Sequence, residues 1–367
     1  MTGNLLRLNL QKWTLTMLRA TKTGFSLIEL LVVVTILGLM MALLLPALQS
    51  AREAARRIQC TSNLRQLGLG LQQYETNYGV YPPSMVLSGR GNTTTWVGGW
   101  SVNGRILSFM EQNTLFNAIN FLTNQTAPIN LTVTGLSIGV FVCPSEVNPQ
   151  SYDANFGSSA VSTVGWCMGD WYVWGGFGAL PNRTAFGPNL SRRAADFRDG
   201  LSSTLMASEV RSHQYERTNC EVLSASWMNT PGSTLPPDVS PTIVTPLLGD
   251  GSPCILSAAG HTSWADGGVD QSGMTTAWAP NTKVVVSASD GVNLASPSSE
   301  DLDLVGTPES SGGPTFAAVT SRSYHPGGVN GLFGDGSVRF IKQTINGATW
   351  RALGSVNGSE IISADQY

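Results

Sequence analysis

The feature that most constrains this chain is an apolar stretch close to its N-terminus, from Phe25 to Leu45. These 21 residues contain one acid, Glu29, and two weakly polar residues, Ser26 and Thr35. As a helix that rises about 1.5 Å per residue, the stretch would extend roughly 31 Å, close to the thickness of a bilayer's hydrocarbon core. The sequence therefore predicts a membrane-spanning helix over residues 25–45.

Glu29 is the exception within this predicted helix, and its carboxylate needs a partner. A charged side chain at the centre of a bilayer costs roughly 2.5–3.5 kcal/mol, so an intramembrane acid is normally paired or close to the interface. A positive group from a neighbouring copy would satisfy it, such as the amino terminus that cleavage between Gly24 and Phe25 would create. The alternative is an ordinary membrane anchor that contains a stray acid.

The residues around this acid resemble the processing site of type IV prepilins and type II secretion pseudopilins. The resemblance lies in Lys22-Thr23-Gly24 followed by Phe25-Ser26-Leu27-Ile28-Glu29-Leu30. It implies that prepilin peptidase cleaves after Gly24 and that Phe25 is then methylated. It also implies that Glu29 pairs with a neighbour's amino terminus during assembly with copies of the chain or other pilin-like subunits. Pro46 stands where many pilins have a helix-bending proline.

Residues 1–24 form a leader with four basic and no acidic side chains. Such a leader keeps the N-terminus in the cytoplasm, so we expect a single-pass protein of the cytoplasmic (inner) membrane with a periplasmic or cell-surface globular domain. Arg52, Arg56 and Arg57 follow the helix and weaken this charge asymmetry. A signal peptide is the rival interpretation, but its apolar core is shorter, about 7 to 15 residues, and no small-residue cleavage site follows Pro46.

The composition of the remaining chain fits an exported globular domain. Only 12% of the residues are charged, and 40 glycines and 10 tryptophans favour a domain rich in turns and short strands over a disordered tail. Without the leader, 17 basic and 24 acidic residues leave a net charge of −7. This negative charge argues against nucleic acid as a partner.

Residues 46–78 continue the apolar helix with an amphipathic pattern, in which apolar residues recur three or four positions apart. Gly79, Pro82 and Pro83 would end this helix. Its apolar stripe could pack on the chain's own globular domain, contact other subunits, or do both on different turns. We therefore expect an α+β, pilin-like fold, with a long N-terminal helix packed on an antiparallel-sheet domain with long loops over residues 79–367.

Within the globular domain, local patterns predict several elements. Residues 105–121 have helical spacing, residues 137–143 are strand-like, and residues 204–210 form a plausible central strand. Residues 331–341 form a hairpin in which Asp335-Gly336 supplies the positive φ angles of a two-residue turn.

His325 and the hairpin carry a second resemblance. His325, nine intervening residues and then Asp335-Gly336 resemble the His-x9-Asp-Gly signature of a large group of pilin-like proteins, abundant in planctomycete-type bacteria, whose domain has no established function. The segments 141–145, 199–204 and 261–267 match the same group. We hypothesise that His325 and Asp335 face each other across the hairpin and fix its loop.

Two classes of function follow from these features. In the first, the chain is a structural subunit of a type IV pilus-like or type II secretion pseudopilus-like filament. In the second, it is a membrane-anchored binding protein for a carbohydrate or other solute, because residues 164–180 concentrate tryptophan and other aromatic residues among glycines. Burial of these aromatics in the core is the commoner explanation of such a cluster.

Catalysis and cofactors are not expected. The chain has three histidines, and no nucleophile elbow, metal-type histidine pair or phosphate-binding glycine loop accompanies them. The resemblance to secretion pseudopilins makes calcium in a C-terminal loop conceivable, but the aspartates at 250, 266, 270, 301 and 303 lack ligand spacing. We therefore predict no metal.

The five cysteines would lie in an oxidising, exported compartment. We expect Cys60 to pair with Cys143, tying the helix to the first strand, and Cys220 to pair with Cys254 across a long loop. Because the count is odd, at least one cysteine stays unpaired. The alternative is that some of the five are simply small, buried apolar residues.

Overall fold

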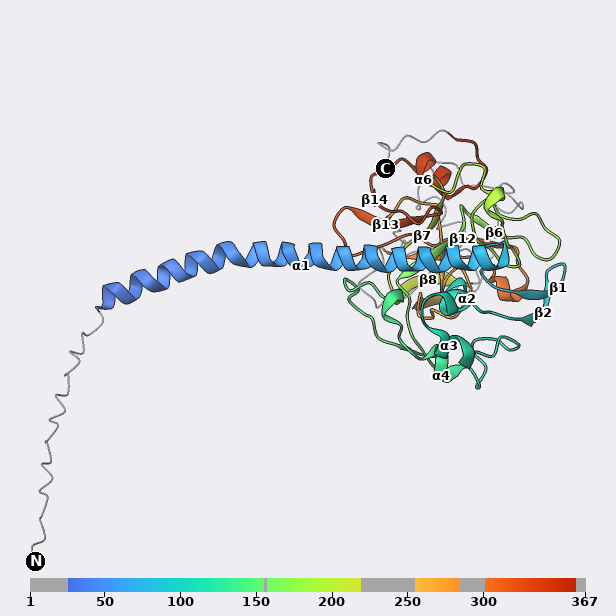
Figure 1. The fold of residues 1–367 in the computed structure, drawn as a ribbon, viewed down its shortest axis with the longest axis horizontal. Helices are drawn as coiled ribbons and strands as arrows, with labels where there is room; N and C mark the ends of the chain where they lie inside the picture. The colour runs from blue at the N-terminus through green and yellow to red at the C-terminus, as the bar shows by residue number, and fades with distance from the viewer. Residues whose placement is uncertain (1–25, 155–156, 219–254, 284–300, 361–367) are drawn as a thin grey trace, which may run out of the picture. The chain divides into compact units, whose positions relative to one another are not determined.

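The computed structural model of the chain describes residues 26–154, 157–218, 255–283 and 301–360 (Figure 1). The chain divides into two units, Met1–Arg52 and Glu53–Tyr367, and helix α1 (Leu27–Tyr78) contributes to both.

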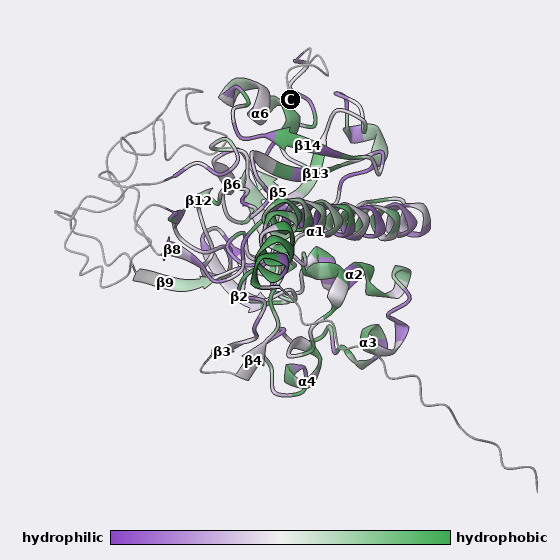
Figure 2. Ribbon diagram, turned by 90° about the vertical axis from the view of Figure 1, so that its left-hand side faces the viewer, coloured by the Kyte–Doolittle hydropathy of each residue, from purple (hydrophilic) through white to green (hydrophobic). Residues whose placement is uncertain are grey.

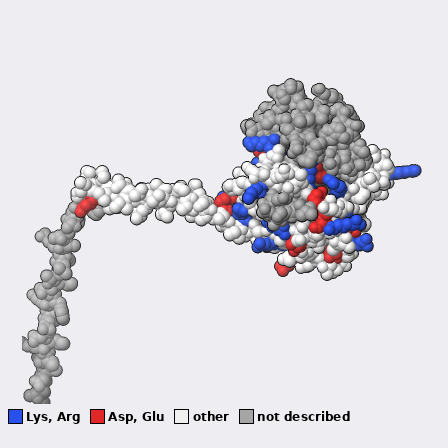
Figure 3. Space-filling view, turned by 90° about the horizontal axis from the view of Figure 1, so that it is seen from above, with Lys and Arg blue, Asp and Glu red and all other residues white. Residues whose placement is uncertain are grey.

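In the first unit, α1 presents an apolar surface. All its large apolar side chains from Leu27 to Leu48 are 44–80% exposed, and Figure 3 shows this segment as uncharged apart from one acidic residue near its start. Among the described residues, α1 is the helix whose length and apolar composition would allow it to cross a membrane. The helix continues through Pro46, which lacks the N–H that would bond to the preceding turn.

In the second unit, α1 buries one face. Its buried residues recur with helical spacing, which confirms the predicted amphipathic pattern for this part of the helix: Cys60, Asn63, Leu64, Leu67, Gly68, Gly70 and Leu71. Figure 2 shows this part of α1 between β13–β14 and α2. Two glycines permit the close approach, since a Cβ at Gly68 would lie 2.8 Å from Leu332 Cδ1 and a Cβ at Gly70 would lie 2.8 Å from Met110 Cγ.

A five-stranded sheet lies next to α1, with the strand order β10-β5-β7-β13-β14. All pairs are antiparallel except the parallel pair β10–β5. The strand β7 occupies the centre, which confirms the predicted central strand at residues 204–210. The bounds are β10 Gly273–Thr275, β5 Val164–Gly169, β7 Leu205–Glu209, β13 Gly328–Phe333 and β14 Val338–Lys342.

Successive residues of the central strands pack on opposite faces of this sheet, as the two-residue period of a strand requires. On one face, Met206 and Leu332 join Leu64 of α1 in the larger hydrophobic core. On the other face, Leu205 and Phe333 pack in the second core, which contains Trp350 and Leu353 of helix α6 (Gly347–Gly354). Both faces are covered, so these strands are buried along their whole length.

A second five-stranded sheet has the order β6-β12-β11-β8-β9, with the parallel pair β11–β8 among antiparallel neighbours. Its strands are β6 Tyr172–Trp174, β12 Thr315–Ala318, β11 Asp303–Val305, β8 Gln214–Thr218 and β9 Ile255–Gly260. Two separate hairpins pair β1 (Leu87–Arg90) with β2 (Thr93–Val97) and β3 (Tyr152–Ala154) with β4 (Gly157–Ser159). The fold class is α+β and pilin-like, as predicted.

The predicted helix at residues 105–121 is broken into shorter pieces. These are α2 (Val102–Ile106), the 3₁₀ turn Leu107–Phe109 and α3 (Asn113–Ala118), and α4 (Leu131–Thr134) follows. Glu111 has a φ angle of +58°, a left-handed conformation that no α-helix can contain, which explains the break. Further 3₁₀ turns lie at Ala194–Asp196 and Glu309–Ser311.

The predicted strand at residues 137–143 is wrong, because the structure has a 3₁₀ turn there, Gly139–Phe141. Asn63 of α1 donates from Nδ2 to the carbonyl oxygens of Gly139 and Val142. A side chain thus satisfies backbone groups that would otherwise need a neighbouring strand.

The hairpin at residues 331–341 is present as β13–β14, but its predicted two-residue turn is wrong. The Phe333 N–H donates to the Ser337 carbonyl at 2.9 Å and the Gly336 N–H donates to the Phe333 carbonyl at 2.9 Å. Three residues therefore form the loop, and only Gly336, with a φ angle of +82°, has the left-handed conformation. This is the three-residue hairpin loop, a tight turn followed by a left-handed glycine.

Candidate functional site

The N-terminal site begins with residues that the structure does not describe, since Gly24 and Phe25 lie outside the described ranges. Glu29 lies in the first turn of α1, and its Oε2 accepts a hydrogen bond from the Ser26 N–H at 2.9 Å. A carboxylate in the first turn of a helix is stabilised by the free N–H groups and the helix dipole there. In the single chain, Glu29 therefore caps its own helix, and its pairing with a neighbouring subunit stays a prediction.

A second site gathers around His325, whose side chain is fully buried. Its Nδ1 lies 2.6 Å from Glu53 Oε1, and its Nε2 lies 3.3 Å from Glu209 Oε1. The Sγ of Cys143, which forms a disulfide with Cys60, lies 3.6 Å from the same Nε2. We call these residues, together with Asn330, the His325 cluster.

The two carboxylates determine the charge of His325. Carboxylates can only accept hydrogen bonds, so a ring with one at each nitrogen is satisfied best when both nitrogens carry protons. Burial by itself lowers the pKa of His325, but the hydrogen bonds and charges of Glu209 and Glu53 outweigh it and raise that pKa. The imidazolium form therefore lies between the buried Glu209 carboxylate and the partly exposed Glu53 carboxylate as an ionic bridge.

Asn330 on β13 fixes the Glu209 carboxylate. Its backbone N–H donates to Glu209 Oε2 and its Nδ2 donates to Oε1, both at 2.8 Å. Glu209 ends β7, so these bonds connect two neighbouring strands of the central sheet. A buried carboxylate is tolerated only when it is paired and hydrogen-bonded, and Glu209 meets both conditions.

Glu53 connects the cluster to α1. It receives a hydrogen bond from Arg56 Nε at 2.9 Å and lies 3.4 Å from Ser145 Oγ. Burial by itself raises the pKa of Glu53, but the hydrogen bonds from His325 and Arg56 outweigh burial and lower that pKa. An acid on α1, an acid on β7 and the loop before β13 thus meet at one imidazole.

The predicted contact between His325 and Asp335 is wrong. The Asp335 carboxylate instead accepts from the Ser337 N–H at 2.9 Å and lies 3.8 Å from Arg339. The reason is that His325 precedes β13 while Asp335 lies in the turn after it. The six residues of β13 separate the two by about 20 Å along the strand. Asp335 and Gly336 shape the turn, whereas His325 contacts Glu53 and Glu209.

Glu53 and Glu209 are partners of His325 that were not predicted from the sequence. One signal for Glu209 was available, since it is an acid at the end of a strand whose residues are all buried. Such an acid requires a cationic or hydrogen-bonding partner. Nothing local to Glu53 distinguishes it from an acid on an exposed helix face.

The cysteines are partly described. Cys60 and Cys143 form the predicted disulfide, with a Cα–Cα distance of 4.9 Å, although Cys143 follows a 3₁₀ turn and not a strand. Cys167 is a buried free thiol, and burial raises its pKa. The predicted pair Cys220–Cys254 lies outside the described residues.

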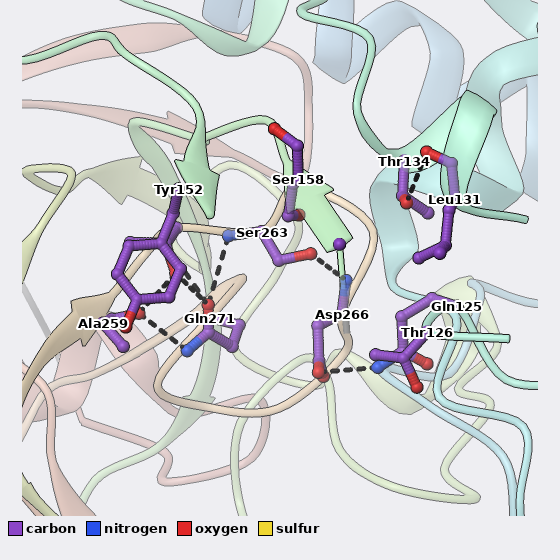
Figure 4. Close-up of a pocket in the computed structure, with 13 residues that line it drawn as sticks. Gln125, Thr126, Leu131, Thr134, Tyr152, Ser158, Ala259, Ser263, Asp266 and Gln271 are labelled. Atoms are coloured by element: carbon purple, nitrogen blue, oxygen red, sulfur yellow. Dashed lines mark hydrogen bonds between the residues drawn. The ribbon is translucent and has the colours of Figure 1, made fainter. Parts of the chain in front are cut away.

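A pocket of about 210 Å³ lies between the segment after α3, the β3–β4 hairpin and the loop that follows β9. Asp266 points into it, and its Oδ2 accepts from Gln125 Nε2 at 2.6 Å (Figure 4). Burial, with the charge of Asp270 as a further cause, raises the pKa of Asp266 to about 7. Tyr152 and Ser158 line the same pocket.

The tryptophan-rich tract does not offer an exposed aromatic platform. Trp166 and Trp171 are at most 1% exposed, and Trp174 is 8% exposed. Their indole rings pack against Phe186, Phe316 and Phe177, respectively. These three tryptophans therefore belong to the core, the commoner of the two explanations given above.

The aspartates considered for calcium are engaged in different ways. Asp303 is paired with the buried Arg322 at 2.9 Å, and Asp301 is paired with Arg211 at 3.2 Å. Asp270 accepts a hydrogen bond from Gln271, and Asp250 lies outside the described residues.

Comparison with known families gives two matches. Residues 19–45 match the prokaryotic N-terminal methylation motif. This motif, with the apolar helix that follows it, indicates a type IV pilin-like or pseudopilin-like substrate of prepilin peptidase that is anchored in a membrane. No curated protein and no solved structure matches the chain. Residues 49–348, most of the chain, match the family described as "Protein of unknown function (DUF1559)", and the chain therefore belongs to this family.

Proposed function

We propose that this chain is a structural subunit of a type IV pilus-like or type II secretion pseudopilus-like filament. In this proposal prepilin peptidase removes residues 1–24 and the new N-terminal Phe25 is methylated. The N-terminus starts in the cytoplasm, and the globular domain lies in the periplasm or at the cell surface. The observation that carries the proposal is the methylation motif at residues 19–45, which overlaps the exposed apolar part of α1.

The attachment of α1 to the globular domain supports this role. A filament subunit must hold its globular domain on the helix that packs with its neighbours. Three types of contact fix the second part of α1: the Cys60–Cys143 disulfide, the Glu53–His325 ion pair and the buried leucines around Gly68.

Mass spectrometry of the N-terminal peptide tests the processing step. We expect membrane-purified protein to begin at a methylated Phe25, and we expect Gly24→Ala to leave the leader attached. An intact Met1 in the wild-type protein, or a cut beyond Pro46, would overturn the proposed processing.

Substitutions at Glu29 test assembly. Glu29→Gln keeps an oxygen that can accept from the Ser26 N–H but removes the charge, so it separates helix capping from charge pairing. We expect that Glu29→Gln and Glu29→Ala both abolish the filaments recovered by shearing the cells. The amount of the subunit in the membrane should stay unchanged. The matched control is Thr35→Ala, because the Thr35 hydroxyl already donates to the Val32 carbonyl of its own helix at 2.8 Å. If Glu29→Gln formed normal filaments, the proposed charge pairing of Glu29 with a neighbouring amino terminus would be rejected.

A membrane-anchored binding protein for a carbohydrate or other solute is the second candidate function. The pocket that contains Asp266 favours it, since the Asp266 carboxyl group, which accepts from Gln125 and Gly268, and Tyr152 face a common space. Binding of a sugar panel to the purified wild type, compared with Asp266→Asn, tests this candidate. Binding that Asp266→Asn removes and Glu29→Ala preserves would favour it over the filament role.

A further inference from the structure

We propose that the chain, when the Cys60–Cys143 disulfide is reduced, binds a thiophilic divalent metal ion such as Zn²⁺ through Cys60, Cys143, Glu209 and His325. This inference does not depend on the filament role. It assigns to the His325 cluster a ligand whose binding is controlled by the redox state of one disulfide.

The geometry of the four donors carries the inference. The two sulfur atoms, a Glu209 oxygen and a His325 nitrogen all lie within 4.8 Å of one another. Ligands of one tetrahedral zinc ion lie about 2.0–2.3 Å from it, so two of them are roughly 3.3–3.8 Å apart. Once the disulfide is reduced, side-chain rotations that move the two sulfur atoms apart and draw the other donors in would place all four around one ion. Two thiolates, an imidazole and a carboxylate are donors that zinc accepts.

Hydrogen bonds from surrounding residues orient the donor side chains, as outer partners orient the ligands in known metal sites. Glu53 accepts a hydrogen bond from the protonated Nδ1 of His325. The other ring nitrogen, Nε2, then faces Cys143 and Glu209 and can bind a metal ion when it carries no proton. A carboxylate on the outer nitrogen of a histidine is the usual partner of a metal-ligating imidazole. Asn330 in turn holds both oxygens of Glu209. The outer partners are therefore already in place in the oxidised chain.

The redox chemistry explains why the two states exclude each other. In the disulfide each sulfur is bonded to the other, so neither is a thiolate ligand. A thiol or phosphine reductant supplies two electrons, the sulfur–sulfur bond breaks, and two protons give Cys60-SH and Cys143-SH while the reductant is oxidised. The metal ion then displaces both thiol protons and the proton on Nε2 of His325. A proton in the oxidised chain and a metal in the reduced chain thus occupy the same position.

Protection from alkylation tests the inference on the full wild-type chain. The detergent-solubilised protein is reduced with a phosphine, freed of reductant under anaerobic conditions, and treated with an alkylating reagent with or without Zn²⁺. Peptide mapping should show that Zn²⁺ slows modification of Cys60 and Cys143 at least about tenfold, in keeping with the affinity of zinc for paired thiolates. Equal modification with and without Zn²⁺ would overturn the proposal.

Cobalt binding identifies the ligands. The test uses a Cys220→Ser, Cys254→Ser background, because those two cysteines lie outside the described residues and could bind metal themselves. We expect the reduced background protein to show the visible absorption of tetrahedral, thiolate-bound Co²⁺, and the oxidised protein to lack it. His325→Ala should lose this spectrum, and Glu53→Gln should weaken binding by about 10–100-fold, as loss of an outer partner does.

His213→Ala is the matched control, because His213 lies outside the cluster and is only partly buried. It should bind cobalt like the background protein. If His325→Ala still bound Co²⁺, the proposed site would be rejected, because the ion would then be bound by thiols without the histidine. A reduced wild-type chain that neither stays folded nor refolds with Zn²⁺, judged by circular dichroism, would reject it as well.

Discussion

The Nδ1 atom of His325 lies 2.6 Å from Oε1 of Glu53, although 272 residues separate the two along the chain. Glu53 lies on α1, and His325 precedes the first strand of the C-terminal hairpin. The histidine of the His-x9-Asp-Gly signature therefore contacts the N-terminal helix rather than the aspartate of its own signature. This contact ties α1 to the loop before β13.

We expect this ion pair to make stability fall as the pH rises. The pKa of His325 is raised in the folded chain, so its contribution is fully present below the unfolded pKa of about 6.5 and is lost as the pH rises through the folded value. The unfolding midpoint of the wild type should therefore decrease across this range. His325→Gln should be less stable at about pH 6 and should show a weaker decrease.

Urea unfolding of both proteins from about pH 6 to about pH 9 measures this difference. His213→Gln is the control, because burial lowers the pKa of His213 and its contribution has the opposite sign. Parallel pH profiles for the wild type and His325→Gln would contradict the ionic bridge.

The disulfide should contribute strongly to stability. It closes a loop with a sequence separation of 83 residues, for which the loss of chain entropy in the unfolded state corresponds to about 4.5 kcal/mol. The Cys60→Ser, Cys143→Ser double variant should unfold at a correspondingly lower urea concentration than the oxidised wild type. A Cys220→Ser, Cys254→Ser background removes the second predicted disulfide from this comparison. In that background, added reductant should destabilise the protein that keeps Cys60 and Cys143 and leave the Cys60→Ser, Cys143→Ser variant unchanged, and an equal effect on both would refute the expectation.

Gly68→Ala should destabilise the globular domain although alanine favours helices. The substitution gains about 1 kcal/mol in helix propensity, but its Cβ would lie 2.8 Å from Cδ1 of the fully buried Leu332, so that side chain would have to shift within the core. Overpacking of this kind costs about 1–3 kcal/mol, so we expect a net loss of up to about 2 kcal/mol. Gln73→Ala, at an exposed position of α1, is the control in thermal unfolding and should not lower the midpoint.

Glu309 should destabilise the fold at alkaline pH. Burial, followed by the charge of Asp270, raises its pKa from 4.5 to about 8. The protonated form is therefore favoured in the folded chain, and stability is lost as the pH rises from about 4.5 through about 8. Glu309→Gln keeps an oxygen that can accept from the Val269 N–H and has no charge to bury.

We expect Glu309→Gln to have a flatter profile of melting temperature between about pH 5 and about pH 9 than the wild type. Glu111→Gln, at an exposed position, should follow the wild-type profile. A Glu309→Gln profile as steep as that of the wild type would show that Glu309 does not titrate as proposed.

Local sequence patterns predicted the elements whose determinants lie within a few residues of one another. The apolar run with Glu29, the helical spacing of Leu64 and Leu67, and the turn residues Asp335-Gly336 are patterns of this kind. The same reasoning failed at residues 137–143, where an apolar run resembles a strand. There Asn63, from a distant part of the chain, satisfies the backbone and replaces a strand partner.

The sequence by itself determined the processing motif, the apolar helix, the hairpin and the α+β class, because hydrophobic period and turn chemistry act between near neighbours. Only the tertiary structure decided what His325 contacts. Its partners Glu53 and Glu209 are brought to it by the packing of α1 and the register of β7 with β13. Ionic partners chosen by packing across hundreds of residues leave no periodic trace in the sequence, so the cluster becomes visible only in the folded chain.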